Sequence, residues 1–391
     1  MVNILLFSPS AIENGRGGEI SSMELAAGLS QTHRVTFVDT NRITSKKLLN
    51  KQTIIKKLEG VKKTERIRFA YRNIFQFQTS FPLPTDLLRL IDLAKRNDII
   101  YSSISNIKMT LIWIFISLIH RKAKFIIGYR KPLYSSKIFS LYNIKYRISL
   151  LLLSLFRKRF YHHALSDHAA NFLTNFFEKK KVIHIIHGIN LDDYKDDSID
   201  EKRKDILNFI YVGYLDDVHK GVKILIESIK EVLDEGTLKD IRFDIYGKGP
   251  LEEEVKAFEK EYPIYVKFRG YISNELVSNV YKQADVYLFT SRREPFPRVL
   301  MEALAANLIV ICSQTIGSIE LLNKKDFAFF LPELTPIALK NKIYKIYNLW
   351  IKKEEKFKKL QKNAKSYVFQ NYSFQRELEI FNNLINQIGR S

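Results

Sequence analysis

The sequence predicts an α/β protein made of two doubly wound domains, each a parallel sheet with helices on both faces. In the first half, strand-like apolar runs at residues 3–8 and 34–38 flank a helical pattern at 19–31, and the alternation begins again at residue 208. Such alternation is typical of parallel sheets, and a chain of 391 residues exceeds what one core usually holds. Two open sheets place a ligand cleft between them, outside the carboxyl ends of their strands.

The first half offers further strand candidates at 98–103 and 124–128. The intervening region 43–77 is poorly patterned and strongly basic, which fits a surface region as well as an acceptor or membrane contact. The second half is more regular, with predicted strands at 208–212, 242–246, 266–268, 286–290 and 309–311, and helices at 221–234, 251–262, 274–283 and 298–306.

These elements set the expected domain boundaries. Residues 1–190 form one Rossmann-like domain and 207–372 the other, joined by a linker at 191–206 whose charged residues show no apolar period. Residues 373–391 form a helix that we expect to pack back on the first domain. Its apolar side chains share one helical face: Leu378, Phe381, Leu384, Ile385 and Ile388.

Composition points to a globular cytoplasmic protein. It is 46% hydrophobic and 27% charged, and its single cysteine, Cys312, has no internal partner for a disulfide. The first residues lack a signal-peptide pattern. The apolar runs 109–119 and 148–156 are shorter than the ~20 residues that span a bilayer, so buried core helices are expected there.

The net charge of +21 favours an anionic partner such as a nucleic acid, an anionic membrane face or a phosphorylated substrate. A lysine-rich surface produced by biased composition explains it equally well. Basic residues also bracket the run 148–156, which fits a core helix with basic ends or an interfacial helix on an anionic membrane. They are Lys145, Arg147, Arg157, Lys158 and Arg159.

One segment, 291–310, carries the main chemical signal. A strand ends near Thr290 and a helix begins near Pro297, where a proline loses no hydrogen bond in the first turn. The free backbone N–H groups of such a helix start bind phosphate. Glu294 on the preceding loop and Glu302 inside the helix supply carboxylates, which accept strong hydrogen bonds from sugar hydroxyls.

This segment, with two glutamates separated by seven residues around Pro-Phe-Pro-Arg-Val-Leu-Met-Glu-Ala-Leu-Ala, resembles the signature of retaining glycosyltransferases of the GT-B fold, in particular glycosyltransferase family 4 (glycosyl transferases group 1). The resemblance covers most of the chain and is strong from about residue 209 to 320. It implies that 1–190 binds the acceptor and 207–372 the nucleotide sugar.

The resemblance extends to other segments. His219-Lys220-Gly221 implies that Lys220 contacts the donor diphosphate, and the turn containing Gly247 borders the base. Tyr271 and Ile272 match the segment that reads the base edge. Gly15-Arg16-Gly17-Gly18 resembles the glycine loop that approaches the donor. The implied catalytic residues are Glu294 and Lys220, and the implied donor-binding residues are Gly17, Gly18, Lys220, Gly247, Tyr271, Ile272, Glu294, Pro295, Phe296, Pro297 and Glu302.

The sequence departs from the family in two places. Tyr214 stands where a phosphate-binding arginine is usual. Tyr129-Arg130 stands near the place of a histidine beside the reacting sugar. Candidates to replace the missing charge are Arg292, Arg293, Arg298 and Arg16; acceptor-side candidates are Arg16, Tyr129 and Arg130, with His162, His163 and His168 as alternatives.

The implied function is retaining, hexosyltransferase-like transfer from a UDP- or GDP-sugar to a hydroxyl of a glycan or lipid-linked saccharide, by an enzyme without a cofactor, on the inner face of a membrane. No Asp-x-Asp loop or His/Cys cluster suggests a metal. Three alternatives remain: a GT-B nucleotide-sugar epimerase, a basic nucleic-acid-associated protein or DNA glycosyltransferase, and an inactive relative. No nucleic acid is expected as a partner, because no recognised binding motif occurs.

Overall fold

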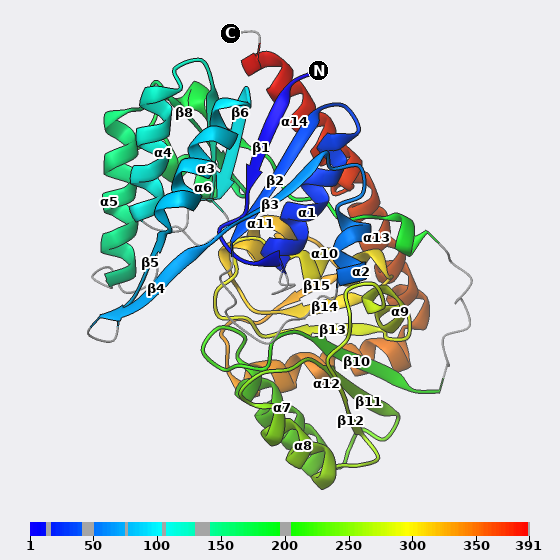
Figure 1. Cartoon of the computed structure of the whole chain (residues 1–391). Coiled ribbons are helices and arrows are strands. Elements are labelled where there is room, and N and C mark those ends of the chain that lie inside the picture. The colour runs from blue at the N-terminus through cyan, green and yellow to red at the C-terminus, as the bar shows by residue number, and fades with distance from the viewer. Residues whose placement is uncertain are drawn as a thin grey trace. The chain divides into compact units, whose positions relative to one another are not determined.

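The computed structural model describes residues 1–12, 17–40, 51–74, 77–103, 107–129, 141–195 and 205–389 (Figure 1). The chain forms two compact units. Unit 1 comprises Met1–His187 with Arg376–Ser391, and unit 2 comprises Gly188–Gln375. Most of the predicted linker falls on 196–204, outside the described residues.

Unit 1 contains a seven-stranded parallel sheet in the order β3-β2-β1-β6-β7-β8-β9. Its strands are β1 (Asn3–Phe7), β2 (Arg34–Thr40), β3 (Lys63–Ile67), β6 (Ile99–Ser103), β7 (Lys124–Tyr129), β8 (Phe160–Ala164) and β9 (Val182–His184). Its helices are α1 (Gly17–Ser30), α2 (Lys51–Lys57), α3 (Pro84–Lys95), α4 (Ile107–Ile119), α5 (Leu141–Leu155), α6 (Asp167–Leu173) and most of α14 (Phe374–Gly389). A hairpin pairs β4 (Phe69–Ile74) with β5 (Phe77–Pro82).

Unit 2 contains a six-stranded parallel sheet in the order β12-β11-β10-β13-β14-β15. Its strands are β10 (Leu207–Val212), β11 (Ile241–Tyr246), β12 (Val266–Gly270), β13 (Val286–Phe289), β14 (Ile309–Cys312) and β15 (Ala328–Phe330). Its helices are α7 (Val222–Asp234), α8 (Glu252–Glu261), α9 (Val277–Tyr281), α10 (Arg298–Ala305), α11 (Ile316–Leu322), α12 (Pro336–Lys352) and α13 (Glu354–Asn371). The predicted pair of doubly wound sheets is confirmed.

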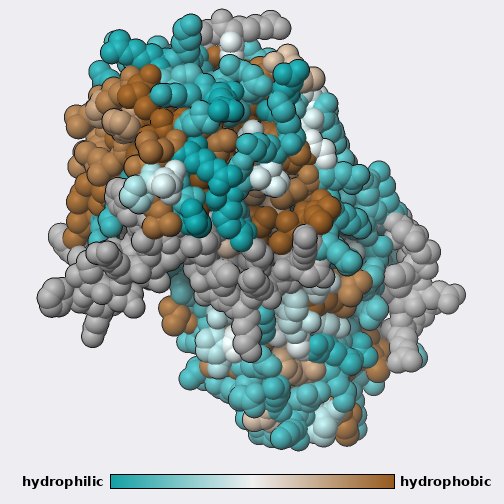
Figure 2. Space-filling view, viewed as in Figure 1, coloured by the Kyte–Doolittle hydropathy of each residue, from teal (hydrophilic) through white to brown (hydrophobic). Residues whose placement is uncertain are grey.

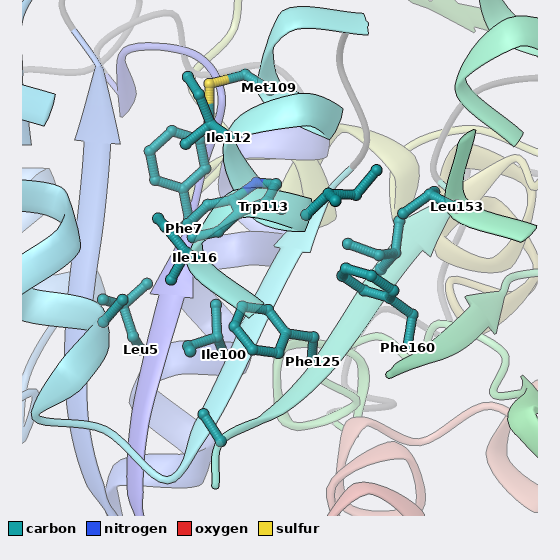
Figure 3. Close-up of a cluster of buried hydrophobic side chains, with 14 of the residues drawn as sticks. Leu5, Phe7, Ile100, Met109, Ile112, Trp113, Ile116, Phe125, Leu153 and Phe160 are labelled. Atoms are coloured by element: carbon teal, nitrogen blue, oxygen red, sulfur yellow. The ribbon is translucent and has the colours of Figure 1, made fainter. Parts of the chain in front are cut away.

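The core of unit 1 explains its layers. On one face of the sheet, Trp113 of α4 packs edge-on against Phe7 of β1, with ring centroids 5.3 Å apart (Figure 3). Phe125 of β7 packs against Phe160 of β8 in the same cluster, which also receives Leu153 of α5. Helices α4 and α5 therefore cover this face of the sheet.

Helix α14 packs on unit 1 against the opposite side of the sheet. Phe381 lies 6.1 Å from the ring of Tyr101, a β6 residue that alternates with the core residue Ile100. Leu378 lies so close to Gly28 of α1 that a Cβ added there would be 2.5 Å from its Cδ2 atom. The return of the C-terminal helix to the first unit, expected from its apolar face, is observed.

Two expectations need correction. The poorly patterned region 43–77 contains α2, β3 and strands of the hairpin among its described residues. Strand β3 was missed because its sequence, Lys-Thr-Glu-Arg-Ile, has charges at an edge position, where strands avoid unwanted pairing. The run 109–119 was expected to be a buried core helix, yet α4 buries only one face and exposes large apolar side chains on the other. None of the described helices combines the length and apolarity needed to cross a bilayer.

Two buried histidines of β8 form hydrogen bonds to neighbouring segments of unit 1. His163 Nε2 donates a hydrogen bond to the carbonyl oxygen of Ile185 at 2.9 Å, and its Nδ1 is hydrogen-bonded to the hydroxyl of Tyr101, also at 2.9 Å. His162 bonds the hydroxyl of Tyr129 at 2.8 Å and stacks on Phe177 with ring centroids 3.5 Å apart. Burial, assisted by the nearby Lys181, lowers the pKa of His162 to about 3.

His162 gives unit 1 a predicted pH dependence. Its folded pKa lies below the unfolded value of 6.5, so unfolding takes up a proton between these two values. We expect the free energy of unfolding of unit 1 to decrease as the pH is lowered from 6.5 towards 3. Between pH 6.5 and pH 5 the decrease should be about 2 kcal/mol at most. Urea titrations in a Trp350→Phe background, where Trp113 alone reports, measure this change. His162→Gln should flatten it, and an equal slope in both proteins would contradict the assignment.

Candidate functional site

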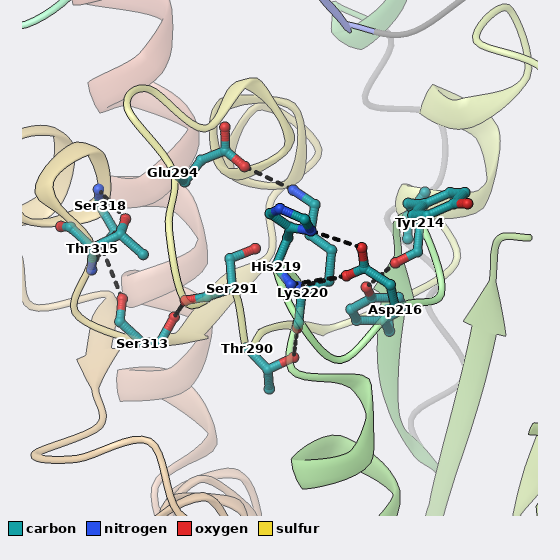
Figure 4. A network of polar contacts seen from close by, with 12 residues as sticks. Tyr214, Asp216, His219, Lys220, Thr290, Ser291, Glu294, Ser313, Thr315 and Ser318 are labelled. Carbon is teal, nitrogen blue, oxygen red and sulfur yellow. Dashed lines mark hydrogen bonds and ion pairs between the residues drawn. The ribbon is translucent and has the colours of Figure 1, made fainter. Parts of the chain in front are cut away.

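The candidate site lies in unit 2, where the loops that follow two neighbouring strands, β10 and β13, come together (Figure 4). These strands are parallel, so both loops leave from the same edge of the sheet. The first loop leads to α7 and contains Lys220, and the second leads to α10 and contains Glu294. Open α/β sheets bind ligands at this edge.

Lys220 and Glu294 form a direct ion pair. The Lys220 Nζ donates to Glu294 Oε2 at 2.7 Å, although the two residues are 74 positions apart in sequence. Both side chains are partly buried, with 27% and 21% of their surface exposed. The structure thus brings the two residues expected to be catalytic into contact.

The backbone fixes the position of Lys220. Asp216 accepts hydrogen bonds from the backbone N–H groups of His219 and Lys220, at 3.1 and 2.9 Å. The Thr290 hydroxyl donates to the Lys220 carbonyl at 2.8 Å. Gly221 has a φ of +63°, and a Cβ added there would lie 2.4 Å from the Thr290 carbonyl oxygen. Only glycine lets the two loops approach this closely.

The loop bearing Glu294 is held by the start of α11. The Gly317 N–H donates to the Glu294 carbonyl at 3.0 Å. A Cβ on Gly317 would lie 2.6 Å from the Pro295 carbonyl oxygen, so a side chain is excluded here too. Thr315 and Ser318 form a capping box that begins α11 and fixes Gly317 beside the loop.

Helix α10 begins at the end of the same loop. Pro297 occupies its N-cap position, one residue before the first turn in which it was expected, and no side chain caps the helix. Glu302 lies in the second turn, its Oε1 3.9 Å from Arg298 Nε. Phe296 is buried, and its ring packs near that of Tyr372, so its side chain is not exposed to a ligand. Pro295 remains partly exposed.

The expected base-side residues lie at the ends of β10, β11 and β12. Gly247 has a φ of +153°, donates its N–H to the Gly270 carbonyl at 2.8 Å, and would place a Cβ 2.0 Å from the Gly213 oxygen. Tyr271 is the residue after Gly270 and is 43% exposed, and Lys248 Nζ lies 5.0 Å from the centroid of its ring. Ile272 is partly exposed beside it.

The arginines expected to replace the one missing at position 214 have different surroundings. Arg292 is engaged, because its Nε donates to the Asp217 carbonyl at 2.8 Å and its guanidinium pairs with the Asp217 carboxylate at 3.1 Å. It fastens the two loops together instead of standing free for phosphate. Arg298 lies beside Glu302, and Arg293 is exposed. Tyr214 itself is 43% exposed on the β10–α7 loop.

Unit 1 contains the remaining candidate residues. Gly17 and Gly18 begin α1, and a Cβ on Gly18 would meet nothing within 4 Å, which leaves its backbone open to approach. Tyr129 does not fit the acceptor contact expected of it, because its ring is a core residue, its hydroxyl is bonded to His162, and burial raises its pKa far above the usual value. Arg16 and Arg130 lie outside the described residues.

Comparison with known proteins agrees with this geometry. Residues 193–367 match the model of the family described as Glycosyl transferases group 1. A probable sucrose-phosphate synthase of Thermosipho melanesiensis is 26% identical over 217 residues, covering 53% of this chain and 48% of that protein. An uncharacterized glycosyltransferase of Methanocaldococcus jannaschii is 25% identical over 167 residues, covering 42% and 41%. The matched part of the chain thus spans less than half the length of these relatives.

Solved structures give the fold of the whole chain. HepE of Anabaena, in complex with UDP and glucose, superposes with a TM-score of 0.74 at 17% identity, covering 99% of this chain and 100% of that one. Sucrose-phosphate synthase from Thermosynechococcus elongatus gives 0.71 at 16% identity, covering 99% of both. The fold is that of the GT-B glycosyltransferases, as predicted. Within it, residues 193–367 are the part that matches the Glycosyl transferases group 1 model.

Two glycines with nearly equal φ angles allow a test of the contact between the β10–α7 and β13–α10 loops. Gly221 and Gly236 have φ of +63° and +61°, but only Gly221 has a neighbour within 4 Å of an added Cβ. We expect Gly236→Ala to cost about 1–2 kcal/mol of unfolding free energy from left-handed strain alone. Gly221→Ala should cost about 3 kcal/mol or more, since the Thr290 carbonyl must also move. Urea denaturation measures both, and equal losses would contradict the steric role of Gly221.

Proposed function

We propose that this protein is a glycosyltransferase that moves a sugar from a nucleotide-diphosphate sugar to a hydroxyl acceptor, a glycan or a lipid-linked saccharide. The observation that carries the proposal is the ion pair between Lys220 and Glu294 at the strand-end edge of unit 2, inside the group 1 region. The alternatives of an epimerase and a nucleic-acid-associated protein receive no comparable support.

The charges of the pair suit a nucleotide-sugar donor. A diphosphate is anionic, and the Lys220 ammonium is the cation positioned by backbone contacts at this edge. No side chain caps the N-terminus of α10, so the backbone N–H groups of its first turn are proposed as further donors to the phosphates. Glu294 supplies a carboxylate beside Lys220 that accepts hydrogen bonds from sugar hydroxyls. The proposed division of labour is diphosphate on Lys220 and α10, sugar on Glu294, and ribose on Glu302.

The proposed chemistry is a front-face transfer with retention of configuration. The bond between the anomeric carbon and the leaving phosphate oxygen breaks as the bond to the acceptor oxygen forms. The acceptor proton passes to the leaving phosphate oxygen, so no further reactant is needed. Lys220 stabilises the charge that develops on the leaving diphosphate. The structures of HepE bound to UDP and to UDP-glucose make UDP-sugars the first donors to test.

Gly247 and Tyr271 are proposed to hold the nucleotide base. Gly247 closes the turn against Gly213 and Gly270, and the half-exposed ring of Tyr271 offers a flat surface beside it. In unit 1, Gly17 and Gly18 at the start of α1 stay the proposed donor contacts, and a Cβ added at Gly18 would meet nothing within 4 Å. The lipid-linked acceptor, the contact with the inner face of a membrane and the cytoplasmic location are further parts of this proposal.

Two variants that each remove one charge separate the roles of the pair. Glu294→Gln should lower transfer by about a hundredfold or more, since a carboxylate contact to the sugar is lost. It should keep UDP binding, because Lys220 is then free of its partner. Lys220→Gln should weaken UDP binding by about tenfold as well as transfer. Thermal stabilisation across a panel of nucleotide sugars measures binding, and release of UDP with and without acceptor measures turnover.

The exposed pair Lys340–Glu235, at 3.0 Å, supplies the control. Glu235→Gln removes one carboxylate from a lysine pair on the surface of unit 2 and should change neither binding nor transfer. Wild-type transfer by Glu294→Gln would sink the assignment of Glu294. Failure of every nucleotide sugar to bind would sink the function, and a rearranged sugar nucleotide formed without acceptor would favour the epimerase.

Transfer should also be insensitive to metal chelation. The proposed site neutralises the diphosphate with the Lys220 ammonium and with backbone N–H groups at the start of α10, so no divalent cation is required for that task. We expect the rate of UDP release to be the same with EDTA as with added magnesium. A rate that falls with EDTA and returns with magnesium would contradict this charge balance.

A further inference from the structure

Helices α4 and α5 of unit 1 contact each other on one face of the sheet, and their outward faces are apolar. Each helix buries an inner face in the core, through Trp113 on α4 and Leu150 and Leu153 on α5. The outward faces expose large apolar side chains: Leu111, Phe115, Leu118 and Ile119 on α4, and Ile144, Ile148, Leu151 and Leu155 on α5. Figure 2 shows brown, hydrophobic atoms gathered over these two helices.

The exposed side chains form a stripe on each helix. Positions 111, 115 and 118 on α4 follow the spacing of one helical face, and so do 144, 148, 151 and 155 on α5. Phe115 is 53% exposed and Leu155 is 75% exposed. The outer face of a helix that covers a sheet is normally polar, and contiguous apolar patches on monomers mark interaction sites. We call these two stripes the α4–α5 face.

Charge identifies the partner. No aspartate or glutamate occurs between Asp98 and Asp167, whereas this stretch contains twelve lysines and arginines. It therefore carries +12 of the net charge of +21, and the other 323 residues carry only +9. A general bias in composition would spread the charge evenly, so it does not explain this concentration. Exposed basic residues flank the apolar stripes: Arg121 and Lys122 follow α4, Lys145 and Arg147 lie in the first half of α5, and Arg157 and Lys158 follow α5.

We propose that the α4–α5 face docks on the surface of an anionic lipid bilayer. The apolar stripes enter the boundary between headgroups and acyl chains, and the basic residues that flank the stripes contact anionic headgroups. The two helices have 13 and 15 residues, so they lie along the surface and do not span it. A second copy of the chain fits this face poorly, because a two-fold contact would set the same basic residues against one another.

This docking surface deepens the proposed function, on which its purpose rests, because it would bring unit 1 to a lipid-linked acceptor. The binding itself needs no sugar donor. Failure of docking and failure of sugar transfer are therefore separate results, provided that UDP stabilisation is measured on the same protein samples.

The first experiment is cosedimentation of the full chain with lipid vesicles. We expect binding to mixed phosphatidylcholine–phosphatidylglycerol vesicles, little binding to phosphatidylcholine alone, and weaker binding as salt is raised. No binding to the mixed vesicles at low salt would overturn the proposal. Equal binding to both kinds of vesicle would also overturn it, since the charge would then play no part.

Two pairs of variants locate the surface. Phe115→Gln/Leu151→Gln should lower vesicle binding by about tenfold or more through lost apolar insertion, while the control Ile337→Gln, at an exposed residue of α12, should not. Arg147→Glu/Arg157→Glu should also lower it, while Lys359→Glu/Lys362→Glu, with the same change in net charge on α13, should not. Circular dichroism and UDP stabilisation confirm that each variant is folded.

Two outcomes contradict this assignment of the surface. If controls and test variants lose binding equally, net charge alone is responsible and the α4–α5 face is not the docking site. If the wild type sediments as a dimer without lipid and Phe115→Gln/Leu151→Gln sediments as a monomer, the face is an interface between two copies of the chain.

Discussion

The candidate site depends on one close approach, between the backbone of Gly221 and the carbonyl oxygen of Thr290. Strands β10 and β13 are neighbours in the sheet, so the loops that follow them share an edge, but adjacency alone does not set their spacing. The absence of a side chain at residue 221 and the hydrogen bond from Thr290 to the carbonyl of Lys220 bring the loops into contact. The ion pair of Lys220 with Glu294 follows from this backbone geometry.

The ion pair of Lys220 with Glu294 is a consequence of the loop contact and not its cause. A partly exposed ion pair contributes little to stability, so Lys220 and Glu294 are not needed to hold the loops together. The backbone bonds and the Arg292–Asp217 contact already do so. Under the proposed function, the two charged groups change partners when the anionic donor binds. Their positions are fixed in advance, which lowers the cost of ordering a binding site.

The sequence predicted the parts of the structure that depend on local patterns. Strands β10 and β13 are largely apolar runs, β11 has apolar residues at alternate positions, and Glu294 lies in a recognisable loop before a helix. Contacts between distant segments leave no such signal. Nothing around Arg292 shows that Asp217 will occupy its guanidinium, and nothing around Tyr129 shows that its hydroxyl will be taken by a histidine on the next strand. The outward apolar stripe of α4 was hidden because the helix is apolar all round, which sequence patterns equate with burial.

The two units thus use their strand ends differently. In unit 2, the ends of β10 and β13 lead to loops whose charged side chains, Lys220 and Glu294, remain partly exposed. In unit 1, the end of β7 places Tyr129 in the core, where it bonds His162 and packs near Tyr146 of α5. A side chain committed to such a buried network is costly to withdraw for binding. Tyr129 is therefore a core residue that packs β7 against α5, and its side chain is not exposed for contact with a ligand.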